Sequence, residues 1–178
     1  MIRISNTIQL QKIQVEDFKF LITLMDDVYK AAYKHFWKDE GNWYVQSQFS
    51  KRNLEKELSA EKTSYYFVLF NTKIVGIFRI LWDEKLSGFE QKKSLKLHRI
   101  YLHKNTQGKG IGKQLLAWLE EEAIKKQYEL IWLDTMDEKP QAFEFYKKLG
   151  YQYHSHCFLT FELLFEDVRK MSQVCKLL

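Results

Sequence analysis

Three glycines within five residues are the clearest candidates for a chemical role in this chain. Gly108, Gly110 and Gly112 stand together in a sequence of 178 residues that has only seven glycines and one proline, and Lys109 and Lys113 are interleaved with them. Glycine lets a ligand come close to the backbone, and a helix that starts behind such a loop offers free N–H groups and the positive end of its dipole. The cluster therefore predicts an anion site, most simply for a pyrophosphate. A glycine-rich connecting turn would have the same sequence.

Two familiar phosphate loops do not match the cluster. A Walker A loop has glycine six positions before a lysine that Ser or Thr follows, whereas here Gln107 stands six positions before Lys113 and Gln114 follows it. The dinucleotide pattern GxGxxG needs its third glycine one residue beyond Gly112, and it should open an alternation of strands and helices. Neither of these nucleotide loops is therefore predicted.

The cluster lies between an expected strand and an expected helix. Residues 95–102 have the composition of a strand. Behind the glycines, Ile111, Leu115, Leu119 and Ala123 recur every four residues, which is the spacing of one apolar helix face. The anion site would therefore lie at a strand-to-helix junction.

The other elements follow from hydrophobic period and turn residues. We expect strands at residues 8–13, 65–70, 74–81, 130–133, 151–154 and 157–164, with a hairpin turn at 71–73. Helices are expected at 18–32, at 53–58 and from Pro140 to a cap at Gly150. Residues 33–49 have no clear period, and the tail at 166–178 is expected to form a short amphipathic helix. This order predicts one mixed α/β domain over residues 1–178, with helices packed on a sheet.

Gln107, Gly110 and Gly112 match the pattern Q/R-x-x-G-x-G/A, and residues 142–151 (AFEFYKKLGY) match A-x-x-F-Y-x-x-x-G-F/Y. In these two motifs and in their separation, the chain resembles the GNAT superfamily of N-acetyltransferases. The resemblance is specific over about residues 95–153 and extends by element order to nearly the whole chain. It implies a mostly antiparallel central sheet of about six to seven strands, flanked by about four helices, with the fourth and fifth strands splayed apart.

The resemblance also implies acetyl-CoA as cofactor. Its pantetheine arm would lie between the splayed strands and pair with the backbone around Ile100 and Leu102. The pyrophosphate would lie on the N–H groups of residues 107–112, with Lys109 or Lys113 adding charge unless these lysines only form a solvated helix face. Lys139 replaces an asparagine that often contacts the cofactor. The expected cofactor-binding residues are Ile100, Tyr101, Leu102, Gln107, Gly108, Lys109, Gly110, Ile111, Gly112, Lys113 and Lys139.

The expected reaction is direct attack of a neutral amine on the thioester carbonyl. By resemblance, the backbone N–H of Leu102 would stabilise the oxyanion that forms there. Tyr146 matches the tyrosine that protonates the departing thiolate in many family members, so it is our candidate general acid. Its alternative role is that of a core aromatic residue on the helix that carries Phe143 and Phe145.

The proton acceptor is harder to assign. An alkyl amine has a pKa of about 10 and is mostly charged at neutral pH, so its proton must leave before attack. Many relatives have a glutamate where this chain has Lys96. His98 shares the face of Lys96 and its imidazole titrates near neutral pH, so it is our candidate catalytic base, directly or through water. A histidine packed in a sheet would have the same sequence, and Asp83 and Glu84 are weaker candidates.

Acceptor pockets in this superfamily are usually built from the first two helices, their loop and the later strands. In this chain that region mixes carboxylates with aromatic rings: Asp26, Asp27, Tyr29, Tyr33, Phe36, Trp37, Asp39, Glu40, Trp43 and Tyr44. Such a mixture can hold a cationic amine by ion pairing and cation–π contact. It favours a small primary amine such as a polyamine, and the chain resembles bacterial polyamine acetyltransferases. The same aromatic residues would also suit a core or a dimer contact.

The composition argues against several other classes. The net charge of +5 comes from 28 basic residues interleaved with 23 acidic ones, which does not indicate nucleic-acid binding. No apolar run approaches the roughly 18 residues of a membrane span and the first residues lack the apolar core of a signal peptide, so we expect a cytoplasmic protein with no membrane partner. Cys157 and Cys175 form no disulfide or zinc pattern, and no metal site is expected. The oligomeric state, monomer or homodimer, is not specified.

Three functional hypotheses fit this sequence. The first is an acetyl-CoA-dependent N-acetyltransferase that acts on a small primary amine. The second is a protein or peptide N-acetyltransferase. The third is a non-catalytic acyl-CoA-binding module, which is suggested by Lys96 and Lys139 at positions where the family pattern has other residues.

Overall fold

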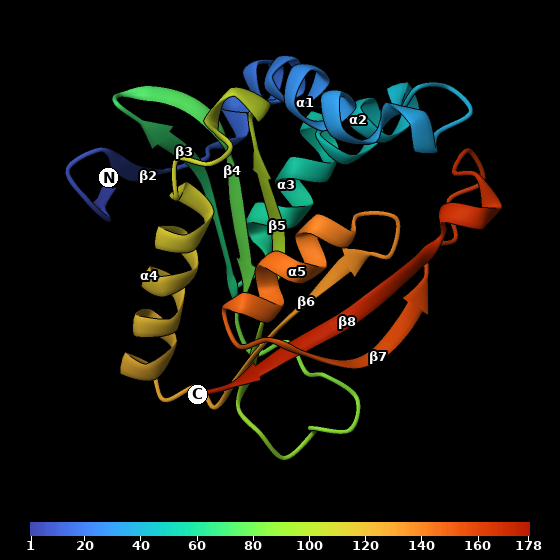
Figure 1. Ribbon diagram of the computed structural model, residues 1–178. Coiled ribbons are helices and arrows are strands. Elements are labelled where there is room, and N and C mark those ends of the chain that lie inside the picture. The colour runs from blue at the N-terminus through green and yellow to red at the C-terminus, as the bar shows by residue number, and fades with distance from the viewer.

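The computed structural model describes all 178 residues and contains one eight-stranded sheet flanked by five helices (Figure 1). The strand order is β1-β2-β3-β4-β5-β6-β8-β7, and neighbours run antiparallel except for the parallel pair β5 and β6. The strands are β1 (Ile2–Arg3), β2 (Ile8–Lys12), β3 (Thr63–Phe70), β4 (Lys73–Leu81), β5 (Ser94–Leu102), β6 (Leu130–Met136), β7 (Gln152–Phe158) and β8 (Lys170–Leu177). The helices are α1 (Phe18–Tyr33), α2 (Asn42–Gln48), α3 (Lys51–Ser59), α4 (Ile111–Lys125) and α5 (Pro140–Lys148). The predicted mixed α/β class and mostly antiparallel sheet are confirmed.

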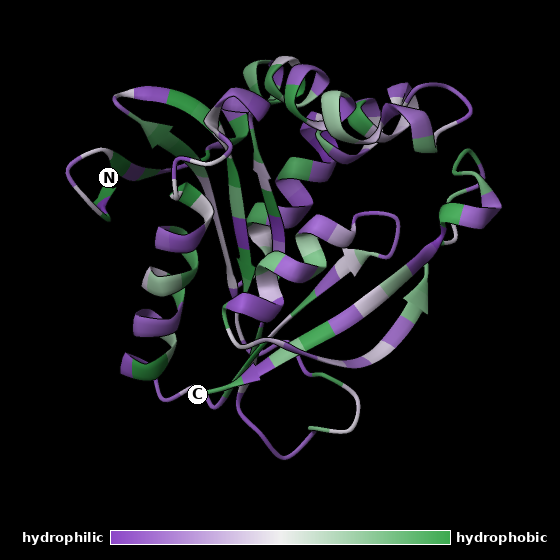
Figure 2. Ribbon diagram, in the orientation of Figure 1, coloured by the Kyte–Doolittle hydropathy of each residue, from purple (hydrophilic) through white to green (hydrophobic).

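Separate apolar cores cover the two faces of the sheet. On one face, Leu115 and Leu119 of α4 are fully buried together with Phe78 of β4. On the other face, Leu21 of α1 and Leu54 of α3 are buried in a second cluster. The ribbon of α4 alternates between hydrophobic and hydrophilic residues in Figure 2, as the four-residue spacing predicts. Burial of these stripes holds the helices on the sheet.

The parallel strands β5 and β6 separate soon after they meet. They pair only at Ser94 with Leu130, at Leu95 with Ile131 and at Lys96 with Trp132. Figure 1 shows the two strands diverging from there, with α5 lying across the opening. The splay that the resemblance implies is therefore confirmed, and it leaves β5 beyond Lys96 without a partner on the side of β6.

The hairpin predicted at residues 71–73 is present. Asn71 and Thr72 connect β3 to β4 with positive φ angles of 47° and 67°. Two successive residues with positive φ angles form a tight hairpin turn, and the twist of this turn matches that of the two strands that it joins. The long strands β3 and β4 are therefore fixed in register beside β5.

The C-terminal part of the chain differs from the expectation. The tail is the strand β8, inserted between β6 and β7, and not an amphipathic helix. The reason lies in the edge of β6 that faces away from β5. Leu130, Ile131 and Leu133 are buried, so the backbone groups on that edge need a hydrogen-bonding partner, and β8 pairs with β6 from Leu130 to Met136. The strand predicted at 157–164 is also wrong, because β7 ends at Phe158 and a loop follows.

These differences alter the number of elements. With β1 and β8, the sheet has eight strands where about six to seven are expected. The helix α2 forms within the segment that has no clear period, and it brings the helices to five. None of these helices combines the length and the apolar character needed to cross a bilayer.

Candidate active site

The glycine cluster borders a cavity of about 300 Å³ at the start of α4. Gly108 and Gly110 have φ angles of +76° and +71°, a left-handed backbone that residues with side chains rarely adopt. A Cβ on Gly108 would meet no atom within 4 Å, and one on Gly110 would meet only the Gln114 amide at 4.0 Å. By contrast, a Cβ on Gly112 would lie 3.2 Å from Cζ of Phe145. The first two glycines therefore shape an open loop, and the third lets α4 approach α5.

Several backbone N–H groups of this loop have no carbonyl partner. The N–H groups of Gln107 and Lys109 are used in turn bonds, to the carbonyl of Lys104 at 3.1 Å and to that of Thr106 at 3.4 Å. The first turn of a helix has no intrahelical acceptor for its N–H groups. The unpaired donors are those of Gly108, Gly110, Ile111, Gly112 and Lys113. This row of donors at the positive end of a helix dipole fits a pyrophosphate.

The three lysines predicted to bind the cofactor lie in different surroundings. Lys113 lines the glycine cavity. Lys109 does not line it, and its Nζ lies 5.4 Å from the centre of the Phe70 ring. Lys139 does not line it either, and its Nζ lies 5.3 Å and 5.2 Å from the ring centres of Tyr33 and Phe36. Only Lys113 is therefore in place to face a phosphate.

A second cavity, of about 220 Å³, lies between the diverging parts of β5 and β6. The first helices give it an aromatic wall. Tyr29 stacks on Tyr44 at 4.4 Å and on Tyr33 at 4.8 Å, and its hydroxyl accepts a hydrogen bond of 3.0 Å from Nε1 of Trp37. The ring of Tyr101 meets Tyr29 edge-on at 5.4 Å. We refer to this cavity below as the aromatic cavity.

The two cavities meet at consecutive residues. Tyr101 and Tyr146 line the aromatic cavity, while the adjacent Leu102 and Phe145 line the glycine cavity. A ligand with a phosphate end and a reactive end can therefore span from one cavity to the other along β5.

The backbone of β5 is available to such a ligand. The N–H of His103 donates to the carbonyl of Val75 at 2.7 Å, and the register places Leu102 opposite Gly76. In an antiparallel pair, hydrogen-bonded and non-bonded residues alternate. The N–H and C=O groups of Ile100 and Leu102 therefore turn away from β4, toward the gap beside β6.

The end of α5 fixes the position of Tyr146. Pro140 occupies the first turn, and Gly150 follows the helix with a φ of +90°. The N–H of Gly150 donates to the carbonyl of Lys147 at 3.0 Å, and the N–H of Tyr151 donates to the carbonyl of Tyr146 at 3.1 Å. This pair of bonds is a Schellman cap, and its outer bond ends on Tyr146 itself.

The side chain of Tyr146 lines the aromatic cavity and is 7% exposed. Its ring meets the rings of Phe145 and Tyr151 at 5.2 Å and 5.9 Å. Burial, with a smaller contribution from the nearby Tyr33, raises the pKa of the Tyr146 phenol well above its usual value. The hydroxyl therefore keeps its proton over the whole neutral range.

His98 also lines the aromatic cavity, at a bulge in β5. Arg79 is paired with Arg99 and Ile80 with Leu97, so His98 is the extra residue. Its Nδ1 lies 3.0 Å from Nη1 of Arg79. An arginine only donates, so Nδ1 accepts and the proton of the ring is on Nε2.

These surroundings count against the base role predicted for His98. Burial, followed by the charges of Arg99, Arg79 and Lys96, lowers its pKa to about 2. The free nitrogen already carries a proton, so the ring presents a donor to the cavity. Lys96, two residues earlier, is ion-paired with Asp134. Neither residue supplies a proton acceptor near neutral pH.

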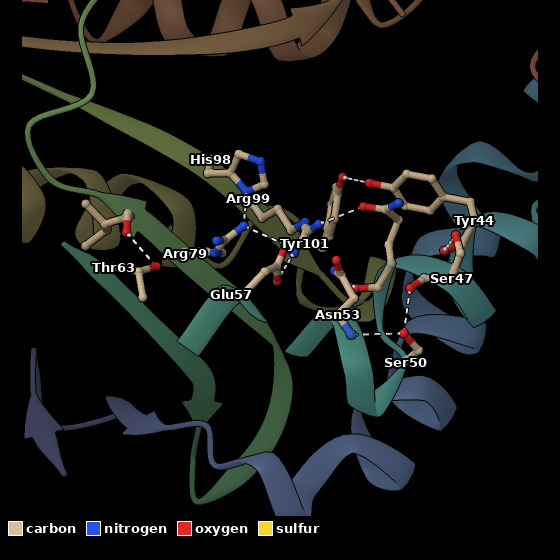
Figure 3. A network of polar contacts seen from close by, with 12 residues as sticks. Tyr44, Ser47, Ser50, Asn53, Glu57, Thr63, Arg79, His98, Arg99 and Tyr101 are labelled. Atoms are coloured by element: carbon tan, nitrogen blue, oxygen red, sulfur yellow. Dashed lines mark hydrogen bonds and ion pairs between the residues drawn. The ribbon is translucent and has the colours of Figure 1, made fainter. Parts of the chain in front are cut away.

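A buried ionic network lies beside His98, and the sequence did not predict it (Figure 3). Glu57 of α3 accepts a hydrogen bond from Nη1 of Arg79 at 2.7 Å and one from Nη1 of Arg99 at 2.8 Å. Arg99 lines the aromatic cavity, and its Nη2 donates to Oε1 of Gln48 at 3.3 Å. The available signal is a single arginine inside β4, whose neighbours on both sides are apolar, and a second arginine between His98 and Ile100 of β5.

The carboxylates expected around the acceptor do not line the aromatic cavity. On the exposed side of α1, Asp26 forms an ion pair with Lys30, and Oδ2 of Asp27 lies 3.0 Å from Nε2 of His103. Asp39 accepts hydrogen bonds from backbone N–H groups at the start of α2, and Glu40 is exposed in the turn before it. Four of the six aromatic residues in that prediction line the cavity, Phe36 and Trp43 do not, and the four acidic residues are absent from it.

No group of three or more His, Cys, Asp or Glu side chains lies close enough together to hold a metal ion. The site therefore consists of backbone N–H groups, aromatic rings and the ionic network.

Comparison with known proteins agrees with the motifs and the fold. The model of the acetyltransferase (GNAT) family matches residues 22–151. An uncharacterised N-acetyltransferase from Lactobacillus delbrueckii subsp. lactis is 24% identical over 65% of this chain and 68% of its own length. The structure of the PaiA N-acetyltransferase from Thermoplasma acidophilum in complex with coenzyme A superposes with a TM-score of 0.71 at 20% identity, covering 97% of this chain and 99% of that one. Spermidine/spermine N-acetyltransferase SpeG from Vibrio cholerae superposes at 0.66 with 16% identity, covering 98% and 95%.

The family model spans both motifs, the splayed strands and the helix that carries Tyr146. The chain therefore belongs to the acetyltransferase (GNAT) family and is an acetyl-CoA-dependent N-acetyltransferase.

Proposed function

We propose that this protein acetylates a small primary amine held in the aromatic cavity, with Tyr146 as the general acid. The observation that carries the proposal is the position of Tyr146. Its protonated hydroxyl borders the aromatic cavity, and the next residue toward the N-terminus borders the glycine cavity. Bound acetyl-CoA would supply an acetyl group joined to sulfur as a thioester, and the thiolate would be the leaving group. Tyr146 donates its proton to that sulfur as the bond to carbon breaks.

Backbone groups of the protein would hold the cofactor from its pyrophosphate to its thioester. The unpaired N–H groups from Gly108 to Lys113 hold the pyrophosphate. The backbone groups of Leu102 pair with the pantetheine amides, because Leu102 borders the glycine cavity. Ile100 borders the same cavity as Tyr146, so its N–H is better placed than that of Leu102 to donate to the thioester oxygen.

Removing the Lys113 charge should weaken cofactor binding. Lys113→Ala is expected to raise the dissociation constant of CoA by about three- to tenfold, an effect that fades at high salt, because an exposed cation beside a phosphate is screened. Lys109→Ala is the matched control, since Lys109 lies over Phe70. Calorimetric titration with CoA measures both variants, and an equal loss in the two would contradict the assignment.

The amine should lose its proton without help from His98. We expect kcat/KM to rise with pH through the pKa of the amine that is used, because only the neutral amine attacks and His98 has a pKa of about 2. No fall is expected below about pH 10, since the raised pKa of Tyr146 keeps the acid protonated there.

Profiles for two amines of different pKa check this pH dependence. The midpoint of the rise should move with the amine. A midpoint that stays near the ordinary imidazole pKa of about 6.5 for both amines, and that disappears in His98→Gln, would restore the base role of His98.

The function itself is tested by following free thiol release from acetyl-CoA with primary amines, amino acids and peptides. Release that depends on a small amine supports the proposal. Turnover with peptides alone would favour protein acetylation. CoA binding with no turnover on any of these amines would overturn the proposed transfer.

A further inference from the structure

The ionic network beside the aromatic cavity has one positive charge too many. The single carboxylate of Glu57 serves the guanidinium groups of both Arg79 and Arg99. The neighbouring His98 and Tyr65 add no negative charge, because burial lowers the pKa of His98 to about 2 and raises that of Tyr65 to about 12. Arg79 and Arg99 are 6% and 4% exposed, so water does little to compensate the excess charge.

The same network has more hydrogen-bond donors than acceptors. The Nε atoms of Arg79 and Arg99 are buried without a partner. His98 contributes its remaining N–H, because Nδ1 is occupied by Arg79. The amide oxygen of Gln48 faces Arg99, which leaves the N–H₂ group of Gln48 free to donate. Arg99, His98 and Gln48 all line the aromatic cavity.

No carboxylate in the aromatic cavity is free to balance this charge. Asp134 is the only acidic residue that lines it, and its oxygens accept from Nζ of Lys96 at 2.5 Å and from Nε2 of Gln173 at 3.1 Å. A second cation next to Arg99 would meet repulsion in a medium of low dielectric. A carboxylate would instead gain charge-assisted hydrogen bonds.

We propose that the amine substrate also carries a carboxylate, as an α-amino acid does, and that Arg99 and the Gln48 amide bind it. This inference rests on the proposed acetylation of a primary amine in the same cavity. The carboxylate supplies the missing negative charge, and the apolar part of the molecule lies on the aromatic wall formed by Tyr29, Tyr33 and Tyr44. A polyamine offers cations where the cavity already holds one.

Matched amines test the preference on the wild-type enzyme, where folding is not in question. Each amino acid is compared with its amide and with its decarboxylated amine, using phenylalanine, leucine and lysine, and spermidine represents the polyamines. Rates are expressed per neutral amine. We expect kcat/KM to be at least about tenfold higher for the amino acids than for the amines without a carboxylate. Equal rates, or faster turnover of spermidine, would overturn the inference and leave the acetylation of amines intact.

Gln48→Glu provides the second test, because it gives Arg99 a counterion while Glu57, Arg79 and Arg99 stay in place. The ratio of kcat/KM for an amino acid to that for its decarboxylated amine should then fall to about one, because the added carboxylate cancels the net charge. Gln48→Met is the matched control, since it removes the amide but adds no charge and should keep part of the preference. A preference unchanged in Gln48→Glu would overturn the assignment to Arg99. Absence of thiol release with every amine would instead refute the proposed function.

Discussion

Replacing Tyr146 with phenylalanine is expected to lower turnover by about 10²- to 10⁴-fold, the usual contribution of a positioned general acid. Protonation neutralises the negative charge that develops on sulfur as the thiolate leaves. Tyr146 is a phenol of the aromatic cavity next to the glycine cavity, and the cap of α5 holds it there. The dissociation constant of CoA should change less than about twofold, because the hydroxyl acts only as the bond to sulfur breaks.

Tyr151→Phe is the matched control for this experiment. Tyr151 is buried, its ring packs against that of Tyr146 at 5.9 Å, and its hydroxyl has no partner. Removing an unsatisfied buried hydroxyl should leave turnover close to wild type and should not lower the free energy of unfolding. Equal turnover in Tyr146→Phe and Tyr151→Phe would remove Tyr146 from the acid role and leave it a core aromatic residue.

Replacing Glu57 should be the most destabilising change in the ionic network. In Glu57→Gln, two buried guanidinium groups lose their shared counterion, and breaking a buried ion pair in this way costs about 3–5 kcal/mol. Denaturant titration of the purified variant measures the change in the free energy of unfolding.

Glu55→Gln gives the comparison on the same helix. Its pair with Lys51 spans 3.9 Å between side chains that are more than half exposed, and such a surface pair contributes about 0–1 kcal/mol. If Glu57→Gln lost no more stability than Glu55→Gln, the network would not hold α3 against β4 and β5. The charge argument for a carboxylate substrate would then lose its basis.

Local chemistry made the glycine loop and α5 predictable. A helix start with Gly108, Gly110 and Gly112 and a helix end at Gly150 are short motifs whose geometry depends on the residues themselves. The splay between β5 and β6 followed from the resemblance that these motifs carry. The tail could not be predicted in this way, because β8 is required by the exposed edge of β6, some 40 residues earlier in the chain.

The ionic network was missed for a similar reason. Glu57, Arg79 and Arg99 lie on three elements and meet only because α3 packs under β4 and β5. The acidic residues near the first helices are not at the cavity, and sequence position alone does not distinguish a cavity wall from the start of a helix, where Asp39 accepts a backbone hydrogen bond. The pKa of His98 depends first on its burial and then on that same meeting of charges, and neither is visible in the sequence.

Identification of the product gives the most direct test of acetyl transfer in the aromatic cavity. Wild-type enzyme is incubated with acetyl-CoA and the preferred amine, and mass spectrometry is combined with the thiol assay. We predict one N-acetylated amine for each thiol released, and almost none of either in Tyr146→Phe. Thiol release without an acetylated amine, or acetylated amine at the wild-type rate in Tyr146→Phe, would contradict direct transfer with Tyr146 as the acid.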